Sequence, residues 1–205
     1  MTYQIIYKND SKEAIYLMKK DKNLIPLFTK VKEVKVTVSK DYYQSLVQTI
    51  IAQQLSSKVA QVIYDRFIKV ANHNITAKHI LTISDDVLRS VGLSRPKIKY
   101  LKSLAEHVDA GNIHFHVFDK MSDQEIIDEL IKVKGIGVWT AQMFLMFSMG
   151  REDVFSSLDL GLRNALKLLL NKPDMSEKDI EAYSLKWKPY RSIVSHYLWH
   201  IWDES

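Results

Sequence analysis

The sequence predicts an all-α protein, and three observations lead to that prediction. The 205 residues contain only 6 Gly and 4 Pro, which leaves little material for an architecture of strands and tight turns. Apolar residues recur at helical spacing along most of the chain. Ser or Asp residues that can cap a helix stand just before most of these segments. We expect about ten helices, in one sizeable domain or two small lobes.

The first half of the chain predicts short helices around two longer ones. The expected elements are an extended segment at 1–9, a helix from residue 12 capped by Asp10 or Ser11, a short apolar set at 24–28, a loop or short strand at 31–38, a helix within 41–55, a helix after Ser56 or Ser57, a short helix after residue 76, and helices capped by Ser84 and Ser94. The last of these begins with Pro96 in its first turn and ends at Gly111.

The second half carries a stronger pattern. The expected elements are a linker at 115–121, a helix opened by the capping box Ser122 to Glu125, a Gly-Ile-Gly turn at 135–137, a helix closed by Gly150, a loop at 151–158, a helix opened by Asp159, one capped by Ser176, and a last one after Pro189. Helix, tight turn, helix, loop and acidic residue therefore follow one another within about forty residues.

Composition narrows the class of protein. The net charge of +5 favours an anionic partner, although lysines on solvated helix faces give the same sum. The absence of Cys excludes disulfides, thiolate zinc sites and iron–sulfur clusters held by Cys. The polar N-terminus and the short apolar run at 143–149 indicate no signal peptide and no membrane span. We expect an intracellular protein of the cytoplasm or nucleoid, or of the nucleus in a eukaryote.

The Gly-Ile-Gly turn is the first candidate binding site. Gly135 and Gly137 are expected to supply the positive φ that so short a turn requires. The following helix then presents unpaired N–H groups and the positive end of its dipole, a site that suits a DNA phosphate. The alternative is a plain helical hairpin whose glycines serve only the turn.

Several blocks together resemble one known family. The pattern L-x-x-V-x-G-I-G-x-W-T-A spans 130–141, and V-F-x-x-x-D follows at 154–159. Further blocks are LVQTIIAQQLSSKVA (46–60), GLSRPKIKYLKSLA (92–105) and WKPYRSIVSHYLWHIW (187–202). The chain from about residue 14 to 202 resembles the helix-hairpin-helix DNA glycosylase superfamily, in particular its 3-methyladenine DNA glycosylase II branch. No separate N-terminal sheet domain, which some members carry, is expected.

The resemblance implies an architecture and a reaction. It implies a six-helix lobe over 40–150 that ends in the hairpin, a second lobe built from 1–39 and 151–205, and an active-site cleft between them. The implied activity is excision of alkylated purines from double-stranded DNA by a monomer. Asp159 matches the catalytic carboxylate, which stabilises the positive charge that develops on the sugar. The alternative for Asp159 is that it only complements the dipole of its helix.

The resemblance also implies which residues line the base pocket and which residues bind DNA. Trp139 and Trp199 match aromatic pocket positions, with Tyr190 or Trp187 added to them; the alternative is that these residues belong to the core. Met143 stands where the bacterial prototype carries Tyr, and Leu158 where it carries a second acid. The DNA-binding loop Gln53 to Leu55 corresponds to the loop that fills the gap left by a flipped base, with Gln54 at the wedge position and Leu55 as its apolar neighbour. The alternative is two solvated glutamines at a helix end. Lys134 belongs to the DNA-binding turn.

Two further expectations concern cofactors. Hairpins of this family hold a monovalent cation through main-chain carbonyls, which the resemblance places at Ile131, Val133 and Ile136; no cofactor is required for the reaction, and Na+ or K+ would be structural. His196 and His200 have metal-like spacing, but no third ligand is evident.

Trp139 separates mechanisms within the family. Members that also cut the strand carry a Lys two residues after the second hairpin Gly, and that position is Trp139 here. We therefore expect a monofunctional enzyme. The competing hypotheses are a mismatch or oxidised-base glycosylase of the same fold, and a non-catalytic helix-hairpin-helix DNA-binding module. The basic group Arg95, Lys97, Lys99 and Lys102 is either a solvated face or a set of phosphate contacts.

Overall fold

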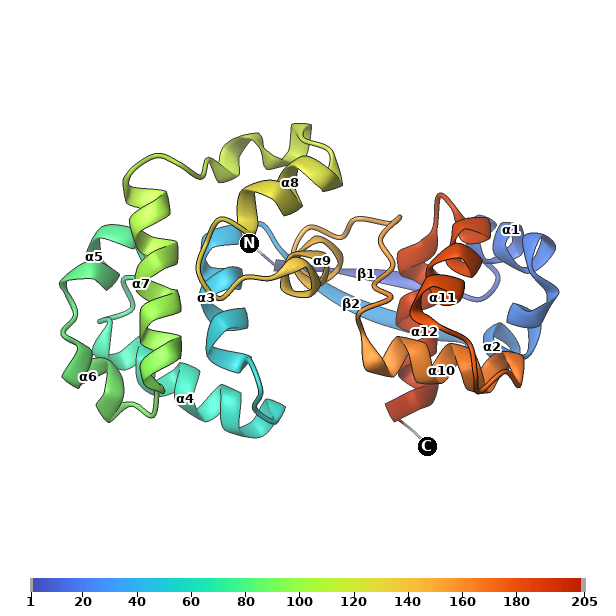
Figure 1. The fold of residues 1–205 in the computed structure, drawn as a ribbon, viewed down its shortest axis with the longest axis horizontal. Helices are drawn as coiled ribbons and strands as arrows, with labels where there is room; N and C mark the ends of the chain where they lie inside the picture. Colours follow the sequence, from blue (N-terminus) through green and yellow to red (C-terminus); the bar gives the residue numbers. More distant parts are fainter. Residues whose placement is uncertain (1, 204–205) are drawn as a thin grey trace. The chain divides into compact units, whose positions relative to one another are not determined.

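The computed structural model describes residues 2–203 of the chain and confirms the helical fold (Figure 1). Contacts divide the chain into a central unit, residues 41–144, and a terminal unit, residues 1–40 with 145–205. The lobe expected from the sequence covers residues 40–150, whereas the central unit in the structure covers residues 41–144. None of the helices in the described part combines the length and apolar character needed to span a bilayer.

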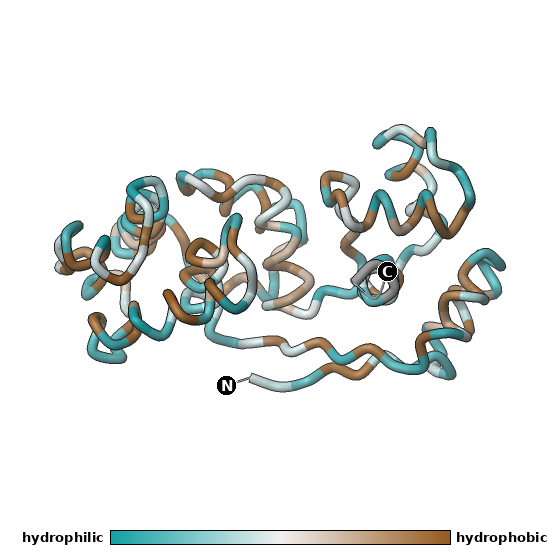
Figure 2. The backbone as a smooth tube through the Cα atoms, turned by 90° about the horizontal axis from the view of Figure 1, so that it is seen from below, coloured by the Kyte–Doolittle hydropathy of each residue, from teal (hydrophilic) through white to brown (hydrophobic). Residues whose placement is uncertain are grey.

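The terminal unit contains a small sheet beside its helices. Strands β1 (Thr2–Lys8) and β2 (Glu33–Ser39) pair antiparallel, with Thr2 opposite Ser39 and Lys8 opposite Glu33. Apolar and polar residues alternate along β2, one of the two paired extended segments in Figure 2. Val36 and Val38 consequently point into the core while the intervening residues are exposed. The lysines of this segment are therefore compatible with a strand.

The helices of the terminal unit come from both ends of the chain. They are α1 (Lys12–Lys20), η1 (Lys22–Leu24), α2 (Ile25–Lys30), α10 (Leu160–Leu170), α11 (Glu177–Ser184), η3 (Leu185–Trp187) and α12 (Arg191–Asp203). One hydrophobic core joins the two segments, and it includes Leu17, Phe28, Leu166, Trp187 and Tyr197. The hydroxyl of Tyr197 donates to the carbonyl of Tyr7 at 2.9 Å, which ties α12 to β1.

The central unit holds most of the hairpin. Its elements are α3 (Tyr42–Ala52), α4 (Ser57–Val70), α5 (Ala77–Thr82), α6 (Asp85–Ser90), α7 (Arg95–Asp109), η2 (Phe115–Lys120), α8 (Asp123–Leu130) and α9 (Val138–Phe147), of which α9 also contributes residues to the terminal unit. Helix α7 packs against α3, α5 and α6 (Figure 1). The linker expected at 115–121 is the short helix η2.

Side-chain caps start the helices at the positions that the sequence indicated. Each capping oxygen accepts a backbone N–H of the first turn, at Ser11, Asp41, Ser56, Ser84, Ser94, Ser122, Asp159 and Ser176. The capping box of Ser122 and Glu125 is present, and Ser176 with Asp179 forms a second one. A cap contributes about 1 kcal/mol to a helix, so local sequence defines these starts well.

Candidate active site

Asp159 lies at the start of α10, where two elements of the terminal unit hold its carboxylate. Oxygen Oδ1 accepts the N–H of Leu162 at 2.8 Å, which makes Asp159 the N-cap of α10. The same oxygen accepts the indole N–H of Trp199, from α12, at 3.0 Å. The capping role considered from the sequence is thus real, and it orients the carboxylate through two charge-assisted bonds.

Gly161 is a part of this arrangement that the sequence did not indicate. A Cβ atom at Gly161 would lie 3.2 Å from Oδ1 of Asp159 and 3.5 Å from the ring of Trp199. Those contacts are tighter than ordinary packing allows for the carboxylate. A glycine here therefore lets the indole approach Asp159 closely. Its signal in the sequence is a glycine within a helix, an unfavourable position that usually has a packing reason.

Trp199 belongs to an aromatic cluster next to Asp159. The ring of Phe147, at the end of α9, lies 5.2 Å from that of Trp199, and His196 lies 5.8 Å from it. Phe147 is 42% exposed and Trp199 is partly buried, so aromatic surface is accessible beside the carboxylate. Such rings attract a cationic, electron-poor base.

Phe147 was missed at the sequence level, although a signal exists. Trp139, Met143 and Phe147 are four residues apart, a spacing that places side chains on one face of a helix. Trp139 is 40% exposed and Met143 only 9% exposed. The spacing therefore extends the set of predicted pocket residues to Phe147.

His196 is the buried member of the aromatic cluster. Its ring stacks on Tyr7 at 5.7 Å and meets the edge of Phe147 at 5.1 Å. The side chain is 4% exposed, and burial lowers the pKa of His196 from 6.5 to about 4. A neutral imidazole therefore supports Trp199 at neutral pH. This burial favours a structural role for His196 over metal binding.

The depressed pKa of His196 predicts acid sensitivity of the fold. Below pH 6.5 the unfolded chain binds a proton at this residue that the folded protein takes up only near pH 4. Stability from the neutral imidazole is hence complete above pH 6.5 and is lost as pH falls toward 4, by about 3 kcal/mol in total. Urea unfolding of wild type and His196→Phe across this range should show a smaller loss in the variant. Equal losses would contradict the assignment.

The other two aromatic candidates lie elsewhere in the terminal unit. Trp187 is fully buried and donates its indole N–H to Asp21 at 2.9 Å, so its interpretation as a pocket wall was wrong. Burying a ring whose polar atom finds a partner is a core arrangement. Tyr190 packs edge-on against Tyr16 of α1 at 5.6 Å. Its proposed contact with substrate stays a prediction.

A cavity in the central unit brings the wedge segment, the hairpin turn and Trp139 together. Its volume is about 660 Å³, and it is lined by Thr49, Ala52, Gln53, Gln54, Leu55, Tyr100, Gly135, Trp139 and Thr140. Gln54 is exposed and left-handed, with φ 59°, and Leu55 is half-buried. Residues predicted from separate blocks of sequence thus face one space.

The hairpin turn uses its two glycines differently. Gly135 has φ +90°, and a Cβ there would lie 2.2 Å from the ring of Tyr100. Gly137 lacks a positive φ, and the position of its Cβ is open within 4 Å, so the expectation of two positive-φ glycines was wrong for Gly137. The physical reason is that α9 begins directly after Gly137. The carbonyl of Gly137 already accepts the N–H of Ala141, a bond of the first helical turn. Gly137 leaves free access to the start of α9.

The remaining hairpin residues are Lys134 and the three residues whose carbonyls were expected to hold a cation. Lys134 is exposed, and its backbone N–H donates to the Ser103 hydroxyl at 3.2 Å. Among the carbonyls expected to hold a cation, that of Val133 accepts the N–H of Ile136 at 3.1 Å, and Ile131 is the C-cap of α8. Within the described residues, no group of three or more His, Asp or Glu side chains could hold a metal ion.

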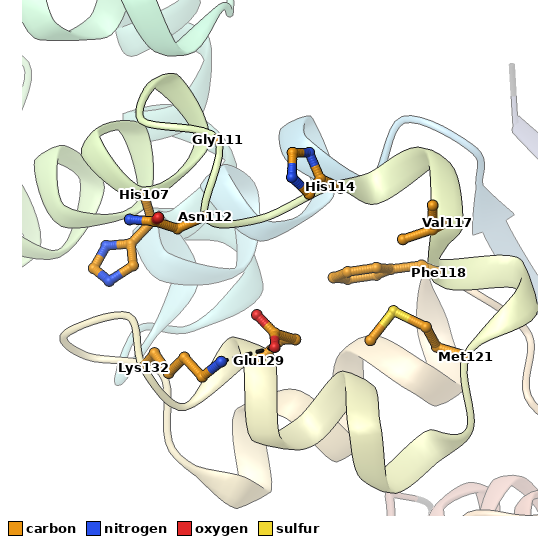
Figure 3. Close-up of a pocket in the computed structure, with 9 residues that line it drawn as sticks. All are labelled: His107, Gly111, Asn112, His114, Val117, Phe118, Met121, Glu129 and Lys132. Carbon is orange, nitrogen blue, oxygen red and sulfur yellow. Dashed lines mark hydrogen bonds and ion pairs between the residues drawn. The ribbon is translucent and has the colours of Figure 1, made fainter.

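A second cavity of the central unit contains none of the predicted site residues. It has a volume of about 550 Å³ and lies between the end of α7, η2 and α8 (Figure 3). His107 and Asn112 line one end, Phe118 and Met121 the other, and Glu129 pairs with Lys132 at 2.7 Å. This space is distinct from the one that faces the wedge and Trp139.

The chain is similar to known proteins over most of its length. Residues 47–190 match the family model described as HhH-GPD superfamily base excision DNA repair protein. The chain is 33% identical over 199 residues to DNA-3-methyladenine glycosylase 1 of Schizosaccharomyces pombe, covering 92% of this chain and 86% of that protein.

Two solved structures share the fold over nearly the whole chain. The DNA-3-methyladenine glycosidase of Bacillus halodurans has a TM-score of 0.88 at 34% identity, covering 97% of this chain and 92% of that one. The 3-methyladenine DNA glycosylase of Schizosaccharomyces pombe, solved in complex with abasic DNA, has a TM-score of 0.83 at 32% identity, covering 92% and 95%.

Proposed function

The chain belongs to the HhH-GPD superfamily of base excision DNA repair proteins, and on this premise we propose that it is a monofunctional glycosylase that removes alkylated purines of the 3-methyladenine type from duplex DNA. The observation that carries the proposal is the carboxylate of Asp159, held by Leu162 and Trp199 beside exposed aromatic surface. Relatives named as 3-methyladenine glycosylases support the substrate class.

The chemistry requires one fixed negative charge. Breaking the bond between C1′ of deoxyribose and the base nitrogen leaves oxocarbenium-like positive charge on the sugar, and the departing purine takes the bonding electrons. The carboxylate of Asp159 stabilises that charge and orients or deprotonates the water that attacks C1′. An alkylated purine is already cationic, so it leaves as a neutral base without a second carboxyl group as general acid.

The aromatic residues select the base. A target base must leave the duplex before Asp159 can reach its sugar. A cationic purine then gains from contact with the faces of Trp199 and Phe147, by about 1 kcal/mol or more per ring when water is excluded. Normal purines lack the positive charge and so lack this gain. Trp139, 40% exposed, offers an aromatic face to the cavity of the central unit beside the wedge segment.

DNA is held at the hairpin and the wedge. The N-terminus of α9 suits a phosphate, because a Cβ at Gly137 would meet nothing within 4 Å and the positive end of the helix dipole attracts anions. Exposed Lys134 adds a positive charge in the same turn, and Gln54 with Leu55 fills the gap left by the flipped base. We infer that the protein acts as a monomer inside the cell.

A monovalent cation is also part of the proposal. The donors would be the carbonyls of Ile131, Val133 and Ile136, neutral oxygens of the kind that replace the hydration shell of Na+ or K+. The carbonyl of Val133 accepts one N–H and keeps a second lone pair that could bind such an ion, which supports this part of the proposal. The cation would supply positive charge behind the phosphate site.

Base release from methylated duplex DNA tests the proposal. Free 3-methyladenine is expected, with the strand uncut until alkali is added, because Trp139 replaces the lysine that would attack the sugar. Borohydride should therefore trap no covalent adduct. Strand scission or a trapped adduct would favour an oxidised-base or mismatch enzyme of the same fold. Tight binding without base release would favour a non-catalytic module. Replacing Na+ and K+ by tetramethylammonium, with weaker binding expected, tests the cation.

A further inference from the structure

The wedge segment Gln53–Leu55 ends α3 in an unusual backbone conformation. Gln53 is the C-cap of α3, Gln54 has φ 59°, and the N–H of Leu55 bonds the carbonyl of Ala52 at 3.1 Å. A residue other than glycine at positive φ costs about 1 kcal/mol or more, so neighbouring contacts must hold it there. Those contacts determine where Gln54 and Leu55 point.

Gln53 supplies one of these contacts and reaches the hairpin turn. Its side-chain amide donates to the carbonyl of Gly135 at 2.9 Å, across 82 residues of sequence. The side chain is partly buried and lines the wall of the 660 Å³ cavity. A glutamine whose donor is used in this way is a link between two loops, whereas its exposed neighbour Gln54 is directed to solvent.

Helix α7 contacts the end of α3 and the hairpin turn, and so supports both loops. Lys97, Tyr100 and Ser103 follow one another at spacing three, so they share one side of the helix. The Lys97 ammonium donates to the carbonyl of Ile51 at 2.7 Å, near the C-terminal end of α3. Tyr100 lies directly under Gly135, and Ser103 accepts the backbone N–H of Lys134.

Lys97 has consequently an internal role. Its burial lowers the pKa of the ammonium group, a cost accepted where the cation meets the carbonyl end of a helix dipole. Lys102 likewise pairs with Asp85. Lys97, one of the four basic residues that the sequence marked as candidate phosphate contacts, thus serves the fold of the central unit.

We propose that Gln53 is a positioning residue that fixes the wedge segment to the hairpin turn, and that it acts on DNA only through Gln54 and Leu55. The link, with the brace on α7, sets in advance the distance between the inserted wedge and the bound phosphate. Binding at the hairpin then drives the wedge into the duplex without an ordering cost at that moment. This inference rests on the proposed glycosylase function.

A double-mutant cycle tests the link. Gln53→Met keeps the length of the side chain and removes the donor. In the otherwise wild-type protein it should lower single-turnover base release and affinity for a duplex with a tetrahydrofuran abasic analogue, each about tenfold, the size of one hydrogen bond to a carbonyl. In a Gln54→Ala, Leu55→Ala background it should change both by less than about twofold.

The outcomes separate positioning from contact and from loss of fold. Equal effects of Gln53→Met in both backgrounds would mean that Gln53 touches DNA itself, and no effect in either would mean that the link is irrelevant; both overturn the proposal. Gln61→Met, at an exposed position of α4, is the matched control and should change nothing. An unchanged melting temperature of Gln53→Met excludes a general defect in folding.

One measurement does not depend on the enzyme reaction. In the free protein, the amide hydrogen of Leu55 should exchange faster with solvent in Gln53→Met than in wild type, since the wedge segment loses its link. If exchange quickens but no base is ever released by wild type, the link stands and the proposed reaction fails. If wild type releases bases and exchange is unchanged, the reaction stands and the link fails.

Discussion

Asp159→Asn is expected to fold as the wild type does and to lose base release by about 10³-fold, the scale of removing one electrostatic stabiliser from a transition state. Asparagine caps helices as well as aspartate does. Its amide oxygen can still accept the N–H of Leu162 and the indole N–H of Trp199. Only the negative charge beneath the sugar disappears. Thermal unfolding and single-turnover release of 3-methyladenine measure the two effects separately.

A second variant separates charge from orientation. Trp199→Phe retains an aromatic ring but removes the donor at 3.0 Å from Asp159. Base release should fall by about tenfold, because the carboxylate keeps its charge and its cap on α10 but loses the orienting bond from the indole. Retained excision of methylated purines by Asp159→Asn would overturn the assignment of Asp159.

Alanine substitutions at the two hairpin glycines should cause different defects, one in stability and the other in DNA affinity. Gly135→Ala should destabilise the protein by about 3 kcal/mol, because alanine meets both a left-handed backbone and the ring of Tyr100. Gly137→Ala should leave stability within about 0.5 kcal/mol, because its Cβ enters open space at an ordinary φ. The added methyl group should instead weaken binding to undamaged duplex by about tenfold, by blocking close approach of a phosphate.

Thermal unfolding and duplex affinity of both variants check this division. The two substitutions are chemically identical and only one residue separates the sites, so each is the control for the other. Duplex affinity of Gly137→Ala equal to that of wild type would show that the start of α9 does not bind phosphate. Normal stability of Gly135→Ala would show that the turn can refold around a side chain.

Local patterns explain which parts of the fold were accessible from sequence. The caps at Ser94, Ser122 and Ser176 depend on bonds within one helical turn, so a few residues determine them. The sheet depends on pairing between β1 and β2, segments separated by two α-helices. The lysines among the β-branched residues left the second strand undecided between loop and strand. Long-range pairing has no comparable local signature.

The residues of the candidate site also fall into two groups, those predicted from the sequence and those that only the structure shows. Asp159, Trp199 and the wedge were named because their blocks resemble a family, and the structure adds how they are held. Phe147, Gly161 and the brace of Lys97, Tyr100 and Ser103 were missed, because each acquires its role from a partner far away in sequence. Trp187 was misjudged for the same reason, since its partner Asp21 lies 166 residues away.

The sequence by itself determined the helical class, the positions of the helix starts and the family, and it predicts Asp159 as the residue whose charge the reaction needs. The tertiary structure decided that Gly135 serves the turn, whereas the position of a Cβ at Gly137 is open. It also decided that Asp159 is oriented by Trp199 and that Gln53 joins the wedge to the hairpin. The reason is physical: caps, spacing and charge are set by neighbours in the chain, whereas burial, close approach and hydrogen bonds between loops exist only once distant segments pack together.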